Sequence, residues 1–418
     1  MGMTLQVWVN DSKVGTLDRH GSGTTFVYDQ GVQPSNAISL NMPVRTASYD
    51  HPYGLLPVFD TNMPEGLLLD NLRRELSKAY GHADAYDILS ETGKNQIGRV
   101  RVLKAGEEPQ RKPSIRSIQE VLEAEATEAF VTDMFRKYGL RSGVSGAMPK
   151  VLLEEEVDSF FDPEKQRITI ETQDYILKFD AADYPGLSLN EYHCLKVARL
   201  AGNKTAECYL GKHGRTLAVQ RFDNLDGHRS GFEDLASLNA MTSEEKYSGT
   251  IEKALFATIK NFSAENAKQN LNELYRQIVT SIALRNGDAH LKNYAVLFDD
   301  AEKGPFTLAP AYDIVTTKAY IASDMMAATY GGSKRWPKPK AVEQMAIRAM
   351  LTSQQAKAII SEVGAAVKEA MPAMIEDFKR FEMLEVGLRV AACWNEGVTE
   401  SLGMDPIDFD YMTDERSS

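Results

Sequence analysis

Hydrophobic and polar residues alternate at the start of the chain, as they do in a half-buried strand. Leu5 to Val9 follows this two-residue period, and Asn10, Asp11 and Gly15 then supply turn residues. A helical spacing comes next, between Leu67 and Tyr80, where Leu68, Leu69, Leu72 and Leu76 share one face. Another short strand is predicted over Ile97 to Leu103. The first hundred residues are therefore expected to form a small β-rich unit with loops.

The middle of the chain carries short apolar runs separated by turns. The polar residues 104–117, which include Pro109 and Pro113, predict a linker between subdomains. One helix is predicted over Asn190 to Ala201. The predicted strands around it are Lys150 to Leu153, Ile168 to Ile170, Tyr175 to Lys178 and Thr216 to Val219.

After about residue 231 the spacing becomes mostly helical. The clearest helix is predicted from an N-cap at Ser263 to a stop at Asn286-Gly287. Tyr294 to Phe298 is the exception, a short apolar strand after a charged loop. Pro372 is placed at the start of one of several packed helices. A β-rich half and a helical half predict two unlike lobes with a ligand cleft between them.

Composition narrows the class of protein. The 418 residues are 43% hydrophobic and 25% charged, which excludes collagenous, disordered and disulfide-scaffold proteins and leaves room for two or three domains. The net charge of −12 argues against nucleic-acid binding over the whole surface, although a local basic patch stays open. The three cysteines lack CxxC spacing and fit buried reduced thiols. With no apolar run long enough for a membrane span and no signal-peptide pattern, we expect a cytoplasmic protein.

The densest polar cluster is residues 286–293, between the long helix and the short strand. Asp288 and Asn293 have the D-x-x-x-x-N spacing of protein kinase catalytic loops, and Asp313 follows twenty residues later. In that chemistry the first carboxylate accepts the proton of the substrate hydroxyl, while the carboxamide and the second carboxylate bind Mg²⁺ on the nucleotide. Each segment alone also fits an ordinary turn or cap. The two together, with a strand between them, favour a kinase site.

Two further features fit a nucleotide site. Residues 142–150 form a small-residue loop that leads into a predicted strand, although the Walker A ending is absent and a plain hairpin loop is an alternative. Lys178 lies in an otherwise apolar strand, where it must either extend its ammonium to solvent or meet an anion such as a phosphate. Val219 to Asp223 fits an interlobe hinge, or equally a strand with a charged turn.

His290 and Lys292 lie inside the same cluster. His290 with the two aspartates could suggest a metallohydrolase, but no HxH, HExxH or second histidine lies nearby. A loop histidine that orients Asp288 is the better interpretation. Lys292 would neutralise charge on the transferring phosphoryl group, or it is an exposed loop lysine.

Blocks along nearly the whole chain resemble one family, the HipA-like serine/threonine kinases that are the toxin halves of bacterial toxin–antitoxin pairs. The blocks in chain order are Phe59-Asp60, Met63 to Glu65, Tyr86 to Glu91, Ile97-Gly98, Ser145 to Ala147 with Lys150, Ile176 to Lys178, Asn190 to Tyr192, Leu217 to Asp223, Lys246-Tyr247, Asp288 to Asn293 and Tyr312 to Ile314.

This resemblance implies an α+β fold, a two-lobed atypical protein-kinase-like fold with a β-rich N-terminal lobe and an all-helical C-terminal lobe. It implies an N-terminal subdomain over residues 1–106, the nucleotide-binding part of the N-lobe over 107–230 and a helical C-lobe over 231–418. The implied cofactors are ATP and Mg²⁺. The implied partners are a protein substrate, typically an aminoacyl-tRNA synthetase whose phosphorylation halts translation, and a HipB-like DNA-binding antitoxin.

The resemblance also assigns residues. Asp288 is the proton acceptor, and Asn293 and Asp313 are the magnesium ligands. Glu191 is a candidate to pair with Lys178, as in kinases generally. The nucleotide-binding residues are Ser145, Gly146, Ala147, Met148, Pro149, Lys150, Lys178, Gln220, Arg221, Phe222, His290, Leu291, Lys292, Asn293, Tyr312 and Asp313.

Three positions depart from the family pattern. Gly143 stands where the family usually has a serine whose autophosphorylation silences the enzyme, so self-inactivation is either absent or moved to Ser142 or Ser145. Met148 replaces a frequent Gln, and Gln220 replaces a frequent hinge Glu.

Two other functions stay open. The first is a nucleotide-binding regulator that works with an antitoxin on DNA without catalysis. Two features favour it: the changed loop residues Gly143 and Met148, and a basic cluster of Lys334, Arg335, Lys338 and Lys340. The second is a small-molecule or lipid kinase, because residues 287–293 also resemble the loops of atypical kinases.

Overall fold

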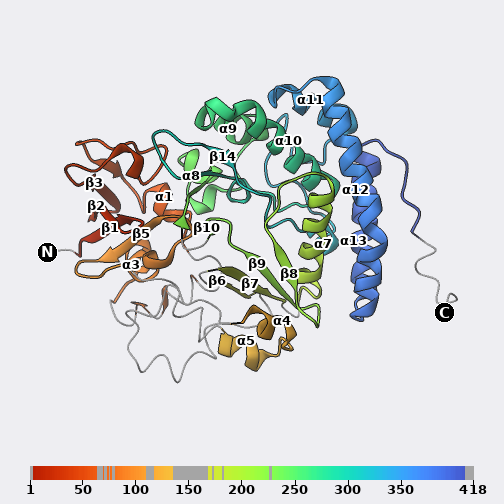
Figure 1. Cartoon of the computed structure of the whole chain (residues 1–418), viewed down its shortest axis with the longest axis horizontal. Coiled ribbons are helices and arrows are strands. Elements are labelled where there is room, and N and C mark those ends of the chain that lie inside the picture. The colour runs from red at the N-terminus through yellow and green to blue at the C-terminus, as the bar shows by residue number, and fades with distance from the viewer. Residues whose placement is uncertain are drawn as a thin grey trace.

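The computed structural model describes residues 3–63, 69, 73–74, 76–77, 81–109, 117–134, 168–171, 174–180, 183–225 and 228–409. Three sequence predictions lie wholly or mostly outside these ranges: the helix over Leu67 to Tyr80, the loop over residues 142–150 and the strand over Lys150 to Leu153. Figure 1 shows an N-terminal sheet at one end of the molecule, a second sheet with helix α7 in the middle, and long helices at the other end.

The N-terminal sheet is antiparallel and five-stranded, in the order β4-β3-β2-β1-β5. The predicted strand over Leu5–Val9 is confirmed as β1, which lies between β2 and β5, and its alternate residues Leu5, Val7 and Val9 are buried. The predicted strand over Ile97 to Leu103 is observed slightly later, as β5. The elements of this part are β1 (Leu5–Val9), β2 (Ser12–His20), β3 (Gly23–Tyr28), β4 (Tyr49–His51), α1 (Pro57–Asp60), α3 (Ala85–Thr92) and β5 (Val100–Lys104).

The middle sheet has four strands in the order β6-β7-β9-β8, and helix α7 packs against β8 and β9. The predicted strands at 168, 175 and 216 and the predicted helix near 190 are confirmed. Within β7 the buried Leu177 and Phe179 flank Lys178, which lies opposite Leu217 of β9. The elements are α4 (Ile118–Glu123), α5 (Glu128–Met134), β6 (Ile168–Glu171), β7 (Tyr175–Phe179), α7 (Leu187–Leu200), β8 (Cys208–Leu210) and β9 (Thr216–Gln220).

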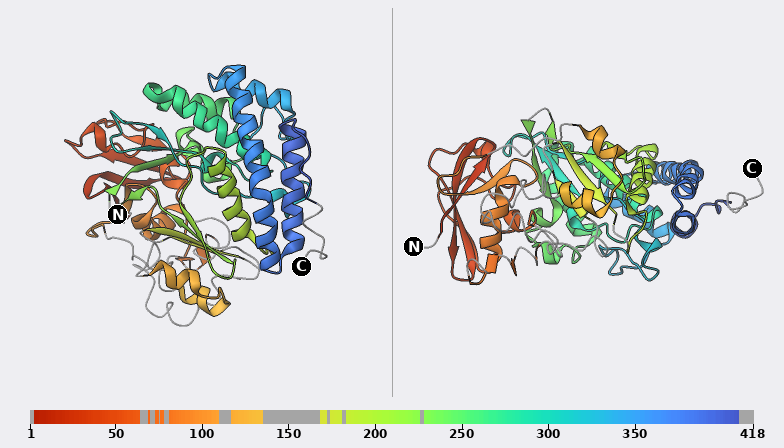
Figure 2. Two further views of the ribbon diagram at one scale, coloured as in Figure 1. Left: turned by 45° about the vertical axis from the view of Figure 1, so that its right-hand side comes forward. Right: turned by 90° about the horizontal axis from the view of Figure 1, so that it is seen from below.

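The C-terminal region is mostly helical, and α12 runs beside α7 and α13 (Figure 2). Its helices share the largest core cluster, which includes Leu274, Ile278 and Trp394. The elements are β10 (Asn224–Leu225), β11 (His228–Arg229), β12 (Gly231–Asp234), α8 (Leu235–Leu238), α9 (Thr258–Phe262), α10 (Ala267–Ala283), β13 (Ala295–Phe298), β14 (Thr307–Leu308), α11 (Pro339–Arg348), α12 (Ser353–Arg380) and α13 (Leu384–Glu396). No helix among the described residues combines the length and the apolar character that a membrane crossing needs.

The prediction of an all-helical C-terminal lobe is wrong, because three strands form an antiparallel sheet in the order β12-β13-β14. Only Tyr294 to Phe298, which contains β13, was expected as a strand. Its partner β12 has four residues and ends in Glu233 and Asp234, so it shows no apolar alternation. The two strands pair across about sixty residues of sequence, a contact that local periodicity does not report.

Helix positions also differ from expectation in three places. The long helix begins at Ala267, after a separate 3₁₀ turn over Ala264–Asn266, rather than directly after an N-cap at Ser263. The long helix ends at Ala283 rather than at Asn286-Gly287, because Arg285 takes up the left-handed conformation that stops it. Gly287 serves a close approach instead, since a Cβ there would lie 2.0 Å from a carboxylate oxygen of Asp324. Pro372 lies inside α12 rather than at a helix start. Packing of α12 against four other helices, α7, α10, α11 and α13, offsets the hydrogen bond that this proline cannot donate.

Polar contacts made by Glu233 and Asp60 join the N-terminal part to the rest of the chain, and we call this contact region the seam. The Glu233 carboxyl group accepts hydrogen bonds from Ser39 Oγ at 2.6 Å and from the Leu40 backbone N–H at 2.8 Å. Asp60 accepts from both the backbone N–H of Ser243 at 2.6 Å and, through its carbonyl oxygen, the Ser243 hydroxyl at 3.0 Å. These bonds hold the N-terminal part against the segment that leads into the candidate site.

Candidate active site

Lys178 is the centre of a charge cluster in which Lys178 and Glu191 are buried and the Asp313 side chain is 45% exposed. Its ammonium donates to Glu191 at 2.7 Å and to Asp313 at 2.5 Å. Asp180, two residues after Lys178, accepts from the N–H groups of Gly186 and Ser188 and so ties the end of β7 to the first turn of α7. Glu191 lies in the next turn of that helix. The pairing of Lys178 with Glu191 is confirmed.

Asp313 follows β14 and meets Lys178 from the opposite side. Its φ of 55° is a left-handed conformation, which strains a residue other than glycine and is common at functional sites. Asn293, at the end of a single 3₁₀ turn over Leu291–Asn293, lies with its amide nitrogen 3.5 Å from the Asp313 carboxylate. Its carbonyl oxygen accepts from the His290 N–H at 3.1 Å. The two predicted magnesium ligands are therefore neighbours.

Asp288 lies in the loop between α10 and that turn. Asp288 keeps an exposed surface, but the protein atoms around its carboxyl replace part of its water and raise its pKa, and the negative charge of Asp313 adds to the effect. The Tyr247 hydroxyl donates to Asp288 at 2.7 Å, which lowers the pKa in part. The Tyr247 ring also stands edge-on to His290, with 5.2 Å between the ring centres. His290 thus lies beside the tyrosine that binds Asp288.

Tyr247 is the site residue that the sequence predictions missed. It lies 41 positions before Asp288, and its phenol carries no signature of catalysis. The resemblance to the family included Lys246-Tyr247 without giving either residue a role. That block was the one signal in the sequence that could have identified it.

Lys292 and Tyr312 are joined to each other by a hydrogen bond within the site. The Tyr312 hydroxyl donates to the carbonyl of Lys292 at 2.6 Å. Burial raises the pKa of Asp234 to about 6, and the nearby ammonium of Lys292 opposes that shift. Leu291 is fully buried in the core and contributes packing. Lys292 therefore lies close enough to the buried Asp234 to act on its charge, as well as lying in the candidate loop.

The three predicted hinge residues, Gln220, Arg221 and Phe222, have different surroundings. Gln220 ends β9, and its N–H is bonded to the Glu207 carbonyl at 2.7 Å. The Arg221 side chain is fully buried in an ion pair with Asp223. The Phe222 ring lies 5.6 Å from that of Tyr312, centre to centre, which gives the site an aromatic wall. Ser145, Gly146, Ala147, Met148, Pro149 and Lys150 lie outside the described residues.

The donor set fits a magnesium ion that nucleotide phosphates help to hold. The described residues contain no cluster of three or more His, Cys, Asp or Glu side chains suited to a metal. Mg²⁺ does not need one, since it commonly takes one or two protein oxygens together with phosphate and water. Asp313 supplies a carboxylate and Asn293 a carboxamide oxygen once its amide group turns toward Asp313. The residues present therefore suit a nucleotide-bound metal rather than a metal held by protein alone.

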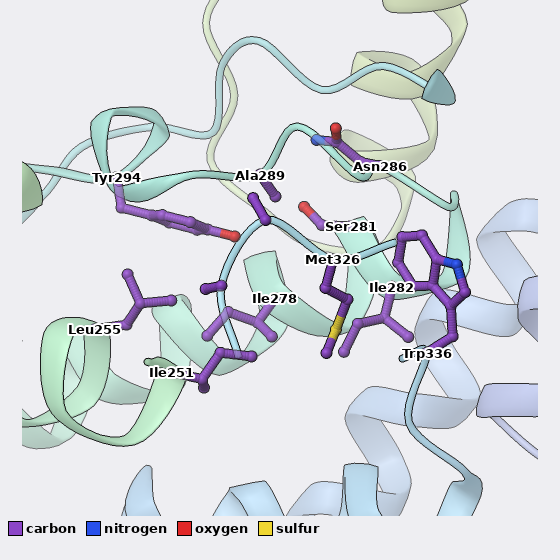
Figure 3. Close-up of a pocket in the computed structure, with 12 residues that line it drawn as sticks. Ile251, Leu255, Ile278, Ser281, Ile282, Asn286, Ala289, Tyr294, Met326 and Trp336 are labelled. Carbon is purple, nitrogen blue, oxygen red and sulfur yellow. The ribbon is translucent and has the colours of Figure 1, made fainter. Parts of the chain in front are cut away.

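An apolar pocket lies behind the loop that carries Asp288 (Figure 3). Ile251, Met326 and Trp336 line it, and the Tyr294 ring extends over it. Among the described residues a second pocket reaches from here to Asn293, Tyr312 and Asp313. The site loop thus packs against a pocket lined mainly by apolar side chains.

Family models cover most of this chain. Residues 5–103 match the HipA N-terminal domain, and residues 142–371 match the HipA-like C-terminal domain. The chain belongs to the HipA-like family. The family resemblance drawn from the motifs is confirmed.

Several relatives of this HipA-like protein are named as kinases. "Putative kinase Y4mE" of Sinorhizobium fredii is 28% identical over 346 residues, which is 76% of this chain and 78% of that protein. A "Putative kinase" of Haemophilus influenzae is 26% identical over 192 residues, 42% of this chain and 53% of that one. The fold is similar to a chain in the Shewanella oneidensis MR-1 complex of HipA, HipB and operator DNA, with a TM-score of 0.63, 16% identity and coverage of 96% and 98%.

Proposed function

We propose that this HipA-like protein is an ATP-dependent serine/threonine protein kinase. The observation that carries the proposal is the cluster in which Lys178 joins Glu191 and Asp313, with Asn293 beside Asp313. A lysine paired to a helix carboxylate, a metal-binding carboxylate and a catalytic-loop Asp and Asn are the parts that protein kinases use for phosphoryl transfer. The relatives named as kinases support the same activity.

In this mechanism the protein's work is positioning and charge stabilisation. Lys178 leaves Asp313 to bind the nucleotide phosphates, while Glu191 keeps its ammonium in place. Asp313 and Asn293 would hold Mg²⁺, which would supply positive charge against the phosphates. The Asp288 carboxylate accepts the proton of the substrate hydroxyl, and Tyr247 holds one of its oxygens so that the other faces the substrate.

We also propose the biological setting that the family suggests. The chain would act as the toxin of a pair with a HipB-like DNA-binding antitoxin. The complex with HipB and operator DNA, which belongs to the Shewanella protein, supports this proposal. The proposed substrate is a protein, with an aminoacyl-tRNA synthetase as the family expectation, and its phosphorylation would inhibit translation and growth.

The test is transfer of the terminal phosphate from radiolabelled ATP to proteins of a bacterial lysate, followed by phosphoamino-acid analysis. Label on serine or threonine, dependent on Mg²⁺, is the expected result. Label that enters sugars or lipids instead would make the protein a small-molecule or lipid kinase. Tight nucleotide binding with no labelled product would overturn the catalytic proposal in favour of a nucleotide-binding regulator.

A further inference from the structure

Asn190 precedes Glu191 on α7 and binds a different part of the site. Its amide group donates to the carbonyl of Thr316 at 3.3 Å, and its carbonyl oxygen accepts the N–H of Thr316 at 3.0 Å. One side chain thus satisfies both backbone polar groups of one residue. Asn190 and Thr316 are both fully buried. Burial away from water makes each of these bonds costly to lose.

The neighbours of this pair are also buried and polar. The indole N–H of Trp394 donates to the Thr316 hydroxyl at 2.7 Å. The Cys194 sulfur lies 3.2 Å from the Asn190 carbonyl oxygen and 3.4 Å from the Thr316 hydroxyl. All three side chains and that of Asn190 have no exposed surface. The pair is therefore enclosed between α7 and α13, where its bonds have no water to replace them.

The contacts close a ring around the candidate site. Glu191 binds Lys178, Lys178 binds Asp313, and Thr316 lies three residues after Asp313. Asn190 binds Thr316 and directly precedes Glu191 in α7, so it links Thr316 to Glu191. On the other side of Asp313 the chain is held at Ala311, whose N–H is bonded to the Lys204 carbonyl at 2.7 Å. The position of Asp313 relative to α7 is thus set from both sides.

We propose that Asn190 is a positioning residue for phosphoryl transfer, which holds Asp313 and Glu191 at the spacing that Lys178 and the nucleotide require. This inference rests on the proposed kinase function. Small displacements of catalytic groups cost large factors in rate, so loosening this bond pair slows transfer even when the fold is kept. Asn190 touches neither nucleotide nor substrate and acts through Thr316.

Asn190→Asp is the most direct perturbation. It keeps the size of the side chain but replaces the amide donor with an oxygen that faces the Thr316 carbonyl. One of the two bonds is then lost, and two acceptors oppose each other in a buried place.

The chain offers a matched control in Asn270. Its carboxamide also spans two backbone groups, donating to the Phe306 carbonyl at 2.9 Å and accepting the Leu308 N–H at 3.1 Å, and it is equally buried. Asn270→Asp likewise replaces a buried amide donor with an oxygen that faces a backbone carbonyl, at a place outside the contacts that surround Lys178. It controls for the general cost of a buried amide-to-carboxylate change.

The experiment compares the two variants with the wild type by kinetics and by cysteine labelling. Steady-state transfer gives kcat and the KM for ATP. Alkylation by N-ethylmaleimide, followed by peptide mass spectrometry at Cys194, reports opening of the Asn190–Thr316 pair without any need for catalysis. Burial raises the pKa of the Cys194 thiol to about 12, so it reacts slowly while the pair is closed.

We expect Asn190→Asp to lower kcat about tenfold or more and to speed Cys194 labelling, while Asn270→Asp stays within about twofold of wild type in both. Asn190→Asp values that match those of Asn270→Asp would overturn the proposal. If Asn190→Asp does not fold, Asn190→Ala against Asn270→Ala answers the same question. A wild type without transfer activity would refute the kinase function. The rates of Cys194 labelling would then show whether Asn190 holds Thr316 against α7.

Discussion

Through Glu233, the stability of the seam between the N-terminal sheet and the rest of the chain depends on pH. Its carboxyl is buried and accepts bonds from Ser39, the Leu40 N–H and the Ser237 hydroxyl. Burial outweighs these donors and raises its pKa from 4.5 to about 7. The folded protein therefore holds a proton on Glu233 at pH values where the unfolded chain has lost it.

The sign and size of the effect follow from this difference. The folded state binds more protons between pH 4.5 and about 7, so the stability that Glu233 contributes falls as pH rises through that window and levels off above it. The two pKa values differ by about 2.5 units, which corresponds to about 3 kcal/mol in total. Between pH 5 and pH 8 the change is about 2.5 kcal/mol, because the unfolded carboxyl is already largely ionised at pH 5.

Glu233→Gln isolates this contribution. The amide is neutral at every pH, and its NH₂ can face the serine hydroxyls, which are able to accept, while its oxygen takes the Leu40 N–H. Urea unfolding of wild type and variant at pH 5 and pH 8 gives two stability differences. Tryptophan fluorescence reports both sides of the seam, because Trp8 lies in β1 and Trp394 in α13.

The stability of Glu233→Gln relative to wild type should rise by about 2.5 kcal/mol between pH 5 and pH 8. Other groups that titrate in this range are present in both proteins and largely cancel. A relative stability that is the same at both pH values would refute the argument that Glu233 is buried without its charge.

Two further substitutions test the site. Tyr247→Phe removes the hydrogen bond that lowers the pKa of Asp288, so the acid limb of the kcat/KM profile should move to higher pH; an unmoved limb would separate Asp288 from the pH dependence. Glu191→Gln removes the charge of one carboxylate that binds Lys178, so the KM for ATP should rise and the free energy of unfolding should fall by about 1–3 kcal/mol, measured by kinetics and urea unfolding. Unchanged values of both would show that Glu191 does not hold Lys178.

The sequence predicted those parts of the site that lie within short segments. Asp288 and Asn293 share one loop, and Asp313 follows twenty residues after Asn293, so residue type and spacing were enough to suggest their chemistry. Lys178 was recognisable because a charged residue in an apolar strand needs a partner. The structure places Lys178, Asn293 and Asp313 in one cluster.

The features that the sequence did not predict depend on distant partners or on backbone geometry. Tyr247 acquires its role from Asp288, 41 residues away, and Glu233 from Ser39, 194 residues away. The end of α10 is set by the left-handed Arg285, whose side chain is anchored to Ser401 at 2.8 Å, rather than by the Asn-Gly pair that follows. Periodicity within a window of ten or twenty residues contains none of this information.

The central claim is that Asp288 is the proton acceptor of a kinase whose nucleotide site is built around Lys178. Asp288→Asn removes the base and preserves the shape of the side chain, so the direct measurement is phosphoryl transfer and Mg-ATP affinity on wild type and this variant side by side. The account predicts that transfer falls by about 10²-fold or more while Mg-ATP affinity is kept. Equal transfer by Asp288→Asn would contradict it.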